Sequence, residues 1–66
     1  MKMNKIKEMS VADLEKELQE LKQELFKLRF SLATNGLDNP MKIPAVRKDI
    51  ARVKTEIRKR EIASQN

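Results

Sequence analysis

The stretch SVADLEKELQELKQELFKLRFSLATNG, residues 10–36, decides the fold of this chain. Its apolar residues recur at alternating spacings of three and four, at Val11, Leu14, Leu18, Leu21, Leu25, Leu28 and Leu32. This heptad pattern, filled in with Glu, Lys, Gln and Ala, is typical of an α-helix with one apolar seam. Ser10, followed by Asp13, resembles a capping box, and Gly36 suits a left-handed residue at a helix C-terminus. We therefore predict a helix over about residues 10–35.

A second seam with the same spacing follows, at Ile43, Val46, Ile50, Val53 and Ile57. Pro40 favours a turn, and Pro44 is tolerated only within the first turn of a helix. We predict a turn over 36–42, a helix over about 43–62 and a frayed tail from Ala63. Because a short turn favours antiparallel neighbours, the predicted fold is all-α. It is a coiled-coil-like, antiparallel two-helix hairpin with a short N-terminal leader, forming a single domain over residues 1–66.

The charges sort onto two sides of this predicted hairpin. The chain has 15 Lys and Arg against 10 Asp and Glu, a net charge of +5. In an antiparallel pair, the heptad e positions face each other and so do the g positions. The e positions place four cations along one side, the basic edge: Lys22, Arg29, Arg47 and Lys54. The g positions place four carboxylates along the other side, the acidic edge: Glu17, Glu24, Asp49 and Glu56.

Like charges across a seam repel, so this arrangement does not serve the stability of the hairpin. We expect the basic edge to face a phosphate backbone, and the acidic edge to face solvent or a basic component. Further cations widen the basic edge on the second helix, at Lys48, Arg52, Arg58 and Lys59. The alternative is a charged helix that is merely solvated.

Phe26 and Phe30, the only aromatic residues, lie four apart and therefore on one face of the first helix, off the seam. Two readings stay open. Leu37 and Met41 of the turn cover them, or they form an exposed contact surface for a protein or for unstacked bases.

The sequence lacks the residues that several classes of function need. The chain has no His, Cys, Tyr or Trp and a single Gly, so we expect no catalytic site, metal site or cofactor. We expect no small-molecule substrate either. No run approaches the roughly 20 apolar residues that span a bilayer, and the basic N-terminus lacks the apolar run of a secretory signal. The sequence predicts a cytoplasmic protein without a membrane partner.

Two stretches carry a more specific resemblance: LFKLRFSLAT at residues 25–34 and VRKDIARVKT at residues 46–55. At this separation they resemble the bacterial large-subunit ribosomal protein family numbered twenty-nine, over nearly the whole chain. The resemblance implies a ribosome-bound helical hairpin that binds large-subunit (23S-type) rRNA near the polypeptide exit tunnel. A neighbouring ribosomal protein would lie beside it, with nascent-chain factors docking nearby.

By position, and with the heptad assignment added, the candidate RNA-binding residues are Arg29, Arg47, Lys48, Arg52, Lys54 and Arg58. A rival hypothesis is a coiled-coil interaction module that dimerises through the same leucine seam.

Overall fold

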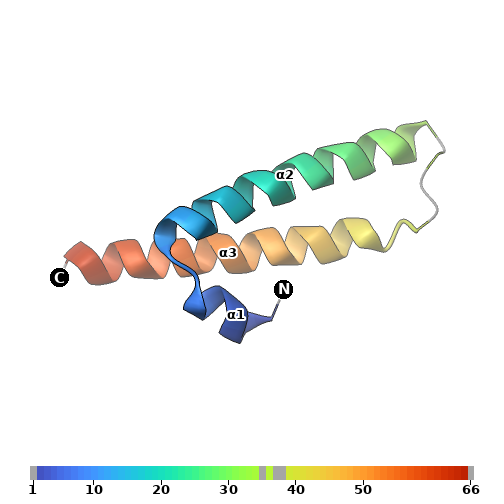
Figure 1. Ribbon diagram of the computed structural model, residues 1–66. Helices are drawn as coiled ribbons and strands as arrows, with labels where there is room; N and C mark the ends of the chain where they lie inside the picture. Colours follow the sequence, from blue (N-terminus) through green and yellow to red (C-terminus); the bar gives the residue numbers. More distant parts are fainter. Residues whose placement is uncertain (1, 35, 37–38, 66) are drawn as a thin grey trace.

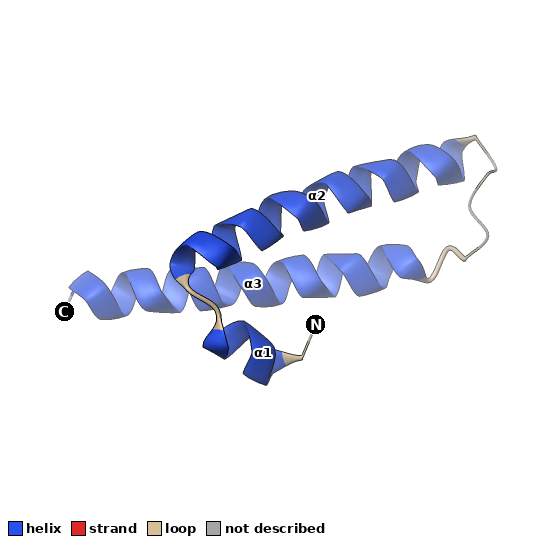
Figure 2. Cartoon of the chain, viewed as in Figure 1, coloured by secondary structure: helices blue, strands red, loops and turns tan. Residues whose placement is uncertain are grey.

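The computed structural model describes residues 2–34, 36 and 39–65, and within these residues all regular structure is helical. The elements are α1 (Met3–Glu8), α2 (Val11–Ala33) and α3 (Lys42–Gln65). The two long helices run antiparallel, and α1 folds back against α3 near its C-terminal end (Figures 1 and 2). The molecule is a rod of 48 × 17 × 15 Å. The predicted all-α fold with two long packed helices is confirmed.

Local capping explains where α2 begins and ends. The Ser10 hydroxyl accepts a hydrogen bond from the Asp13 amide at 3.1 Å, as the capping pattern predicted. At the other end, the Gly36 amide donates to the Ser31 carbonyl at 2.8 Å. This bond places Gly36 one residue beyond the position that a left-handed glycine normally holds. Gly36 therefore does not hold the left-handed position that the sequence predicted for it.

The start of α3 depends on the Asn39-Pro40 turn. The Asn39 side-chain oxygen accepts a hydrogen bond from the Met41 amide at 3.1 Å, and the Asn39 backbone carbonyl accepts one from the Lys42 amide at 3.2 Å. The helix begins at Lys42. Pro44 is then its third residue, where the missing amide costs no intrahelical hydrogen bond.

The C-terminal end of α3 differs from the prediction. The helix continues to Gln65, and the Ser64 hydroxyl donates to the Glu61 carbonyl at 2.9 Å. The predicted end of this helix at about residue 62 is therefore wrong, and Asn66, the last residue of the predicted frayed tail, lies outside the described residues.

The two predicted seams form the core. Its buried members on the long helices are Leu14, Leu21, Val46, Ile50 and Val53. The seam is not uniform along its length, because the residues at its two ends on α2, Val11 and Leu32, are 43% and 48% exposed. The heptad pattern thus predicted the partners, but not how far the burial extends.

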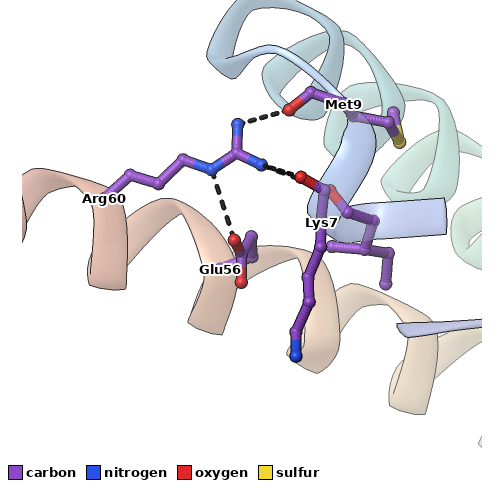
Figure 3. Close-up of polar contacts among 5 residues, drawn as sticks. Lys7, Met9, Glu56 and Arg60 are labelled. Atoms are coloured by element: carbon purple, nitrogen blue, oxygen red, sulfur yellow. Dashed lines mark hydrogen bonds and ion pairs between the residues drawn. The ribbon is translucent and has the colours of Figure 1, made fainter. Parts of the chain in front are cut away.

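The N-terminal leader is the main feature that the sequence did not predict. It forms α1, whose Ile6 is fully buried in the same core. The Arg60 guanidinium lies against the C-terminal end of α1, as Figure 3 shows. It donates to the Lys7 carbonyl at 3.0 Å and also to the Met9 carbonyl. The last carbonyls of a helix lack intrahelical partners, so this guanidinium satisfies groups that would otherwise be orphaned.

Arg60 also binds Glu56, one turn earlier on α3, with 3.3 Å between Nε and Oε1 (Figure 3). We call Glu56, Arg60 and the end of α1 the clamp. Glu56 is only 9% exposed. Its predicted place on an acidic edge facing solvent or another component is therefore wrong, because α1 packs against this part of α3 and Arg60 neutralises the carboxylate.

Candidate nucleic-acid interface

The six candidate RNA-binding residues all lie on the surface. Arg29 is on α2, and the other five are on α3: Arg47, Lys48, Arg52, Lys54 and Arg58. Each of the six is exposed. An α-helix turns about 100° per residue, so residues seven and eleven apart share one face. Arg47, Lys54 and Arg58 have this spacing and form one cationic stripe along α3.

Lys48 and Arg52 lie further round, on the outer surface of α3. Lys48 joins Arg47 in lining a shallow surface hollow, together with Pro44 and Ala51. The hollow therefore brings two cations to the same small area, and its other two lining residues, Pro44 and Ala51, have short side chains. A phosphate seated here would meet an ammonium and a guanidinium at once.

Arg52 differs from the others because it has a partner on its own helix. Its guanidinium lies 3.3 Å from the Asp49 carboxylate. A phosphate that binds Arg52 must compete with this carboxylate. Exposed pairs of this kind contribute little stability, so the competition is weak.

Arg29 comes from the other long helix. The antiparallel heptad register places it opposite Arg47, as it places Lys22 opposite Lys54. By this register the candidates divide between a flank shared by both helices and the outer surface of α3, rather than gathering at one point.

The carboxylates of α3 are less available than the sequence suggested. Glu56 is buried and bound to Arg60, and Asp49 is bound to Arg52. Among the residues described, Arg29, Arg47, Lys48, Lys54 and Arg58 form no ion pair. These two pairs leave the net charge of α3 unchanged, and they leave Glu61 as the one carboxylate of α3 outside them.

Phe26 and Phe30 are 71% and 64% exposed. The reading in which turn residues cover them is wrong for Met41, which is itself 70% exposed. Leu37, the other turn residue expected to cover the rings, lies outside the described residues. Phe26 lines a shallow hollow with Lys22, Gln23 and Lys27, so this aromatic surface has cations on two sides.

Comparison with known proteins identifies the family. The family model described as "Ribosomal L29 protein" matches residues 4–60. A "Large ribosomal subunit protein uL29" of Ruminiclostridium cellulolyticum is 59% identical over 66 residues, covering 100% of this chain and 98% of the relative. This chain belongs to the ribosomal L29 protein family.

Two further relatives with the same description agree. The uL29 protein of Caldicellulosiruptor bescii is 54% identical over 65 residues, covering 98% of this chain and 90% of its own length. That of Leuconostoc citreum is 57% identical over 65 residues, covering 98% and 96%. The family named from the resemblance of residues 25–34 and 46–55 is thus confirmed.

The stretch matched by the ribosomal L29 model begins within α1 and ends at Arg60. Both sides of the clamp therefore lie inside the family region. Sequence reasoning missed Ile6 and Arg60, although one signal was available. Arg60 stands three residues after Ile57 and so occupies the next position of the seam. A cation at a seam position requires a polar partner inside the packed end of the hairpin.

Two absences complete the description of the surface. Over the part of the chain that the structure describes, no helix combines the length and apolarity needed to cross a membrane. In the same residues, no three acidic side chains come together in a group that could bind a metal ion.

Proposed function

We propose that this ribosomal L29 family member binds the RNA of the large ribosomal subunit through the basic edge and the outer surface of α3, near the polypeptide exit tunnel. As a member of this family, it is a structural component of the large ribosomal subunit and not an enzyme. The proposal adds the surface that makes the contact, the RNA as its target and the place in the subunit.

One observation supports the RNA-binding surface above the others. Five exposed cations, four of them on α3, form no ion pair with any described residue, while Glu56 and Asp49 are both engaged by arginines. An excess of unpaired positive charge along a rod is what a phosphate backbone complements. Each phosphate neutralised would release counterions, and that release would drive binding.

The shape of the molecule limits how the RNA can be read. A-form RNA has a deep, narrow major groove, which a helix of this kind does not enter. The cations of α3 instead suit contact with phosphates and sugars along the outside of folded RNA. We therefore propose recognition of RNA shape by the stripe Arg47, Lys54 and Arg58, with Lys48 and Arg52 beside it.

The other side of the hairpin suits a different neighbour. Glu17 and Glu24 remain on the acidic edge of α2, and Glu20 lies exposed beside them. We propose that this side of α2 faces a neighbouring ribosomal protein at the exit tunnel, with nascent-chain factors close by. The same proposal places the protein on ribosomes in the cytoplasm.

The rival hypothesis, a coiled-coil module that dimerises through its leucine seam, meets an obstacle in the structure. Leu21, Val46 and Val53 are between 0% and 7% exposed within one chain, so most of the seam is already used inside the hairpin. Sedimentation of the free protein separates the two hypotheses. A monomer that binds RNA supports the proposal, and a stable dimer without RNA affinity supports the rival.

The test of RNA binding reverses three cations, in the variant Arg47→Glu/Arg52→Glu/Lys54→Glu. A filter-binding titration against an in vitro transcript of large-subunit rRNA, repeated at several salt concentrations, measures affinity and its salt dependence. Each lost phosphate contact lowers the log–log salt slope by roughly 0.7–0.9. We therefore expect weaker binding and a slope that is smaller by about 2 to 3.

A matched control carries the same net charge on another part of the molecule, in Lys2→Glu/Lys5→Glu/Lys16→Glu. These lysines are exposed on α1, its cap and the N-terminal half of α2. The control should keep most of the affinity, and both variants should keep their helicity in far-UV circular dichroism. Equal losses in the two variants would show that only net charge matters, and unchanged affinity of the first variant would refute the proposed surface.

A further inference from the structure

We infer that Phe26 and Phe30 form a stacking surface for unpaired bases of the RNA whose phosphates bind the basic edge. The inference rests on the proposed function and deepens it. It assigns an aromatic contact to unpaired nucleotides, in addition to the electrostatic contact with the backbone.

The first argument is exposure. Phe26 is 71% and Phe30 64% exposed, although both belong to well-formed turns of α2. Aromatic side chains contribute a large apolar area when they are buried in a protein core. Neither ring takes part in the core, so the fold of the free chain gives no reason for two phenylalanines at these positions.

The second argument is their spacing. Residues four apart on a helix are neighbours on its surface. Two exposed rings at this spacing form one continuous aromatic surface. Unpaired bases are splayed out and stacked on such aromatic side chains when proteins bind single-stranded loops and bulges.

The third argument is the charge around the rings. The positions beside Phe26 on the helix surface, three and four residues away, are Lys22, Gln23, Arg29 and Phe30. None of them is acidic. Lys22, Gln23 and Lys27 line the shallow hollow beside the Phe26 ring. A base on the ring would have its own phosphate within reach of an ammonium group.

This charge pattern favours RNA over a protein partner. An apolar protein surface would meet Lys22, Lys27 and Arg29 at the rim and would have to desolvate them. A nucleotide offers a flat π-face to the ring and a phosphate to the cation, which is the combination that single-strand binding surfaces use. The aromatic surface is also continuous with the basic edge, because Lys22 and Arg29 of that edge lie four and three residues from Phe26 on the same helix.

The test compares two double variants, Phe26→Ala/Phe30→Ala and Phe26→Leu/Phe30→Leu, against the in vitro transcript of large-subunit rRNA. Stacking on an aromatic ring is worth roughly 1–3 kcal/mol per base by alanine substitution. We therefore expect the alanine variant to bind about tenfold or more weakly. The leucine variant should lose most of the same affinity, because it keeps apolar surface but has no ring.

The salt dependence distinguishes this inference from the proposed function. The phenylalanine variants remove no phosphate contact, so their salt slope should equal that of the unaltered protein, whereas the reversal of Arg47, Arg52 and Lys54 should lower it. Val11→Ala, which truncates another exposed apolar residue of α2, serves as the matched control and should bind RNA as the unaltered protein does.

Three results would overturn the inference. If both phenylalanine variants bind RNA normally while the charge reversal weakens binding, the stacking surface is refuted and the proposed function stands. If only the alanine variant is impaired and the leucine variant binds normally, the contact is apolar packing rather than stacking. If RNA affinity is unchanged but the alanine variant enters large subunits poorly, the partner of the rings is a protein.

Discussion

The two ends of the hairpin are built differently. At the base, where α1 packs against α3, Ile6, Leu14 and Val53 are fully buried, and Arg60 closes the C-terminal end of α1. At the tip, near the turn, Leu32 is 48% and Met41 70% exposed. The base therefore buries three side chains completely, although Val11 and Ile62 at its outer end are 43% and 52% exposed, whereas no described side chain of the tip half is fully buried.

The difference follows from the number of elements at each end. Two helices alone can bury only the stripes that face each other, and the flanks of the seam stay open. At the base, α1 adds a third element that covers one flank and contributes Ile6. At the tip no described residue does this, so Leu32 and the rings on α2 stay exposed in the free chain. The free energy of folding should thus be concentrated at the base, and the inferred aromatic contact lies in the tip half.

The largest expected effect separates two leucines of the same seam. Leu14→Ala removes a fully buried side chain at the base and should lower the free energy of unfolding by about 2–5 kcal/mol. Leu32→Ala, at the tip, should cost about 1 kcal/mol or less, because its side chain is already half exposed. Urea unfolding followed by far-UV circular dichroism measures both. Equal losses would mean that the seam is equally important along its whole length.

A smaller effect should come from the clamp. Arg60→Met leaves Glu56 buried without its cation and leaves the Lys7 and Met9 carbonyls without a donor. We expect a loss of about 1–3 kcal/mol in the free energy of unfolding. Hydrogen exchange should show the amides of α1 exchanging faster, while those in the middle of α2 and α3 are less affected.

The matched control for the clamp is Arg58→Met, two residues away on the exposed face of α3. It should change the free energy of unfolding by less than about 0.5 kcal/mol. Adding Glu56→Gln to Arg60→Met should restore part of the stability, because the buried carboxylate is then neutral. No rescue, together with unchanged exchange in α1, would contradict the role assigned to the pair.

The smallest expected effect compares the two caps of α2. Ser10→Ala removes the acceptor of the Asp13 amide and should cost about 1 kcal/mol. Thr34→Val should cost less. Its hydroxyl donates to the Phe30 and Ser31 carbonyls, which also accept from the Thr34 and Gly36 amides. Thermal unfolding in parallel measures the order of the two, and a larger loss at Thr34 would show that the tip end of α2 is the more strongly held.

The long helices were predictable because their signal is periodic and repeated. The seams that begin at Val11 and Ile43 each repeat the same spacing, so no single residue decides them. The capping role of Ser10 was also readable, since it depends on residues only three apart. The two seams likewise predicted which side chains of α2 and α3 pack together in the core.

The leader was not predictable in the same way. A helix of six residues is too short to show periodicity and is marginal on its own. Its only buried residue, Ile6, belongs to a core that also contains Ile50 and Val53, more than forty positions further along the chain. The burial of Glu56 depends on the same tertiary contact, so a heptad assignment for two helices placed it on an open edge.

Lysine acetylation tests most directly the central claim that rRNA covers the basic edge. The reactivity of each lysine is compared between the free protein and the protein within purified large subunits. The account predicts that Lys22, Lys48 and Lys54, all exposed in the free chain, become strongly protected in the subunit, and that nuclease treatment of the rRNA restores their reactivity. Lysines 48 and 54 that react in the intact subunit as fast as in the free protein would contradict it.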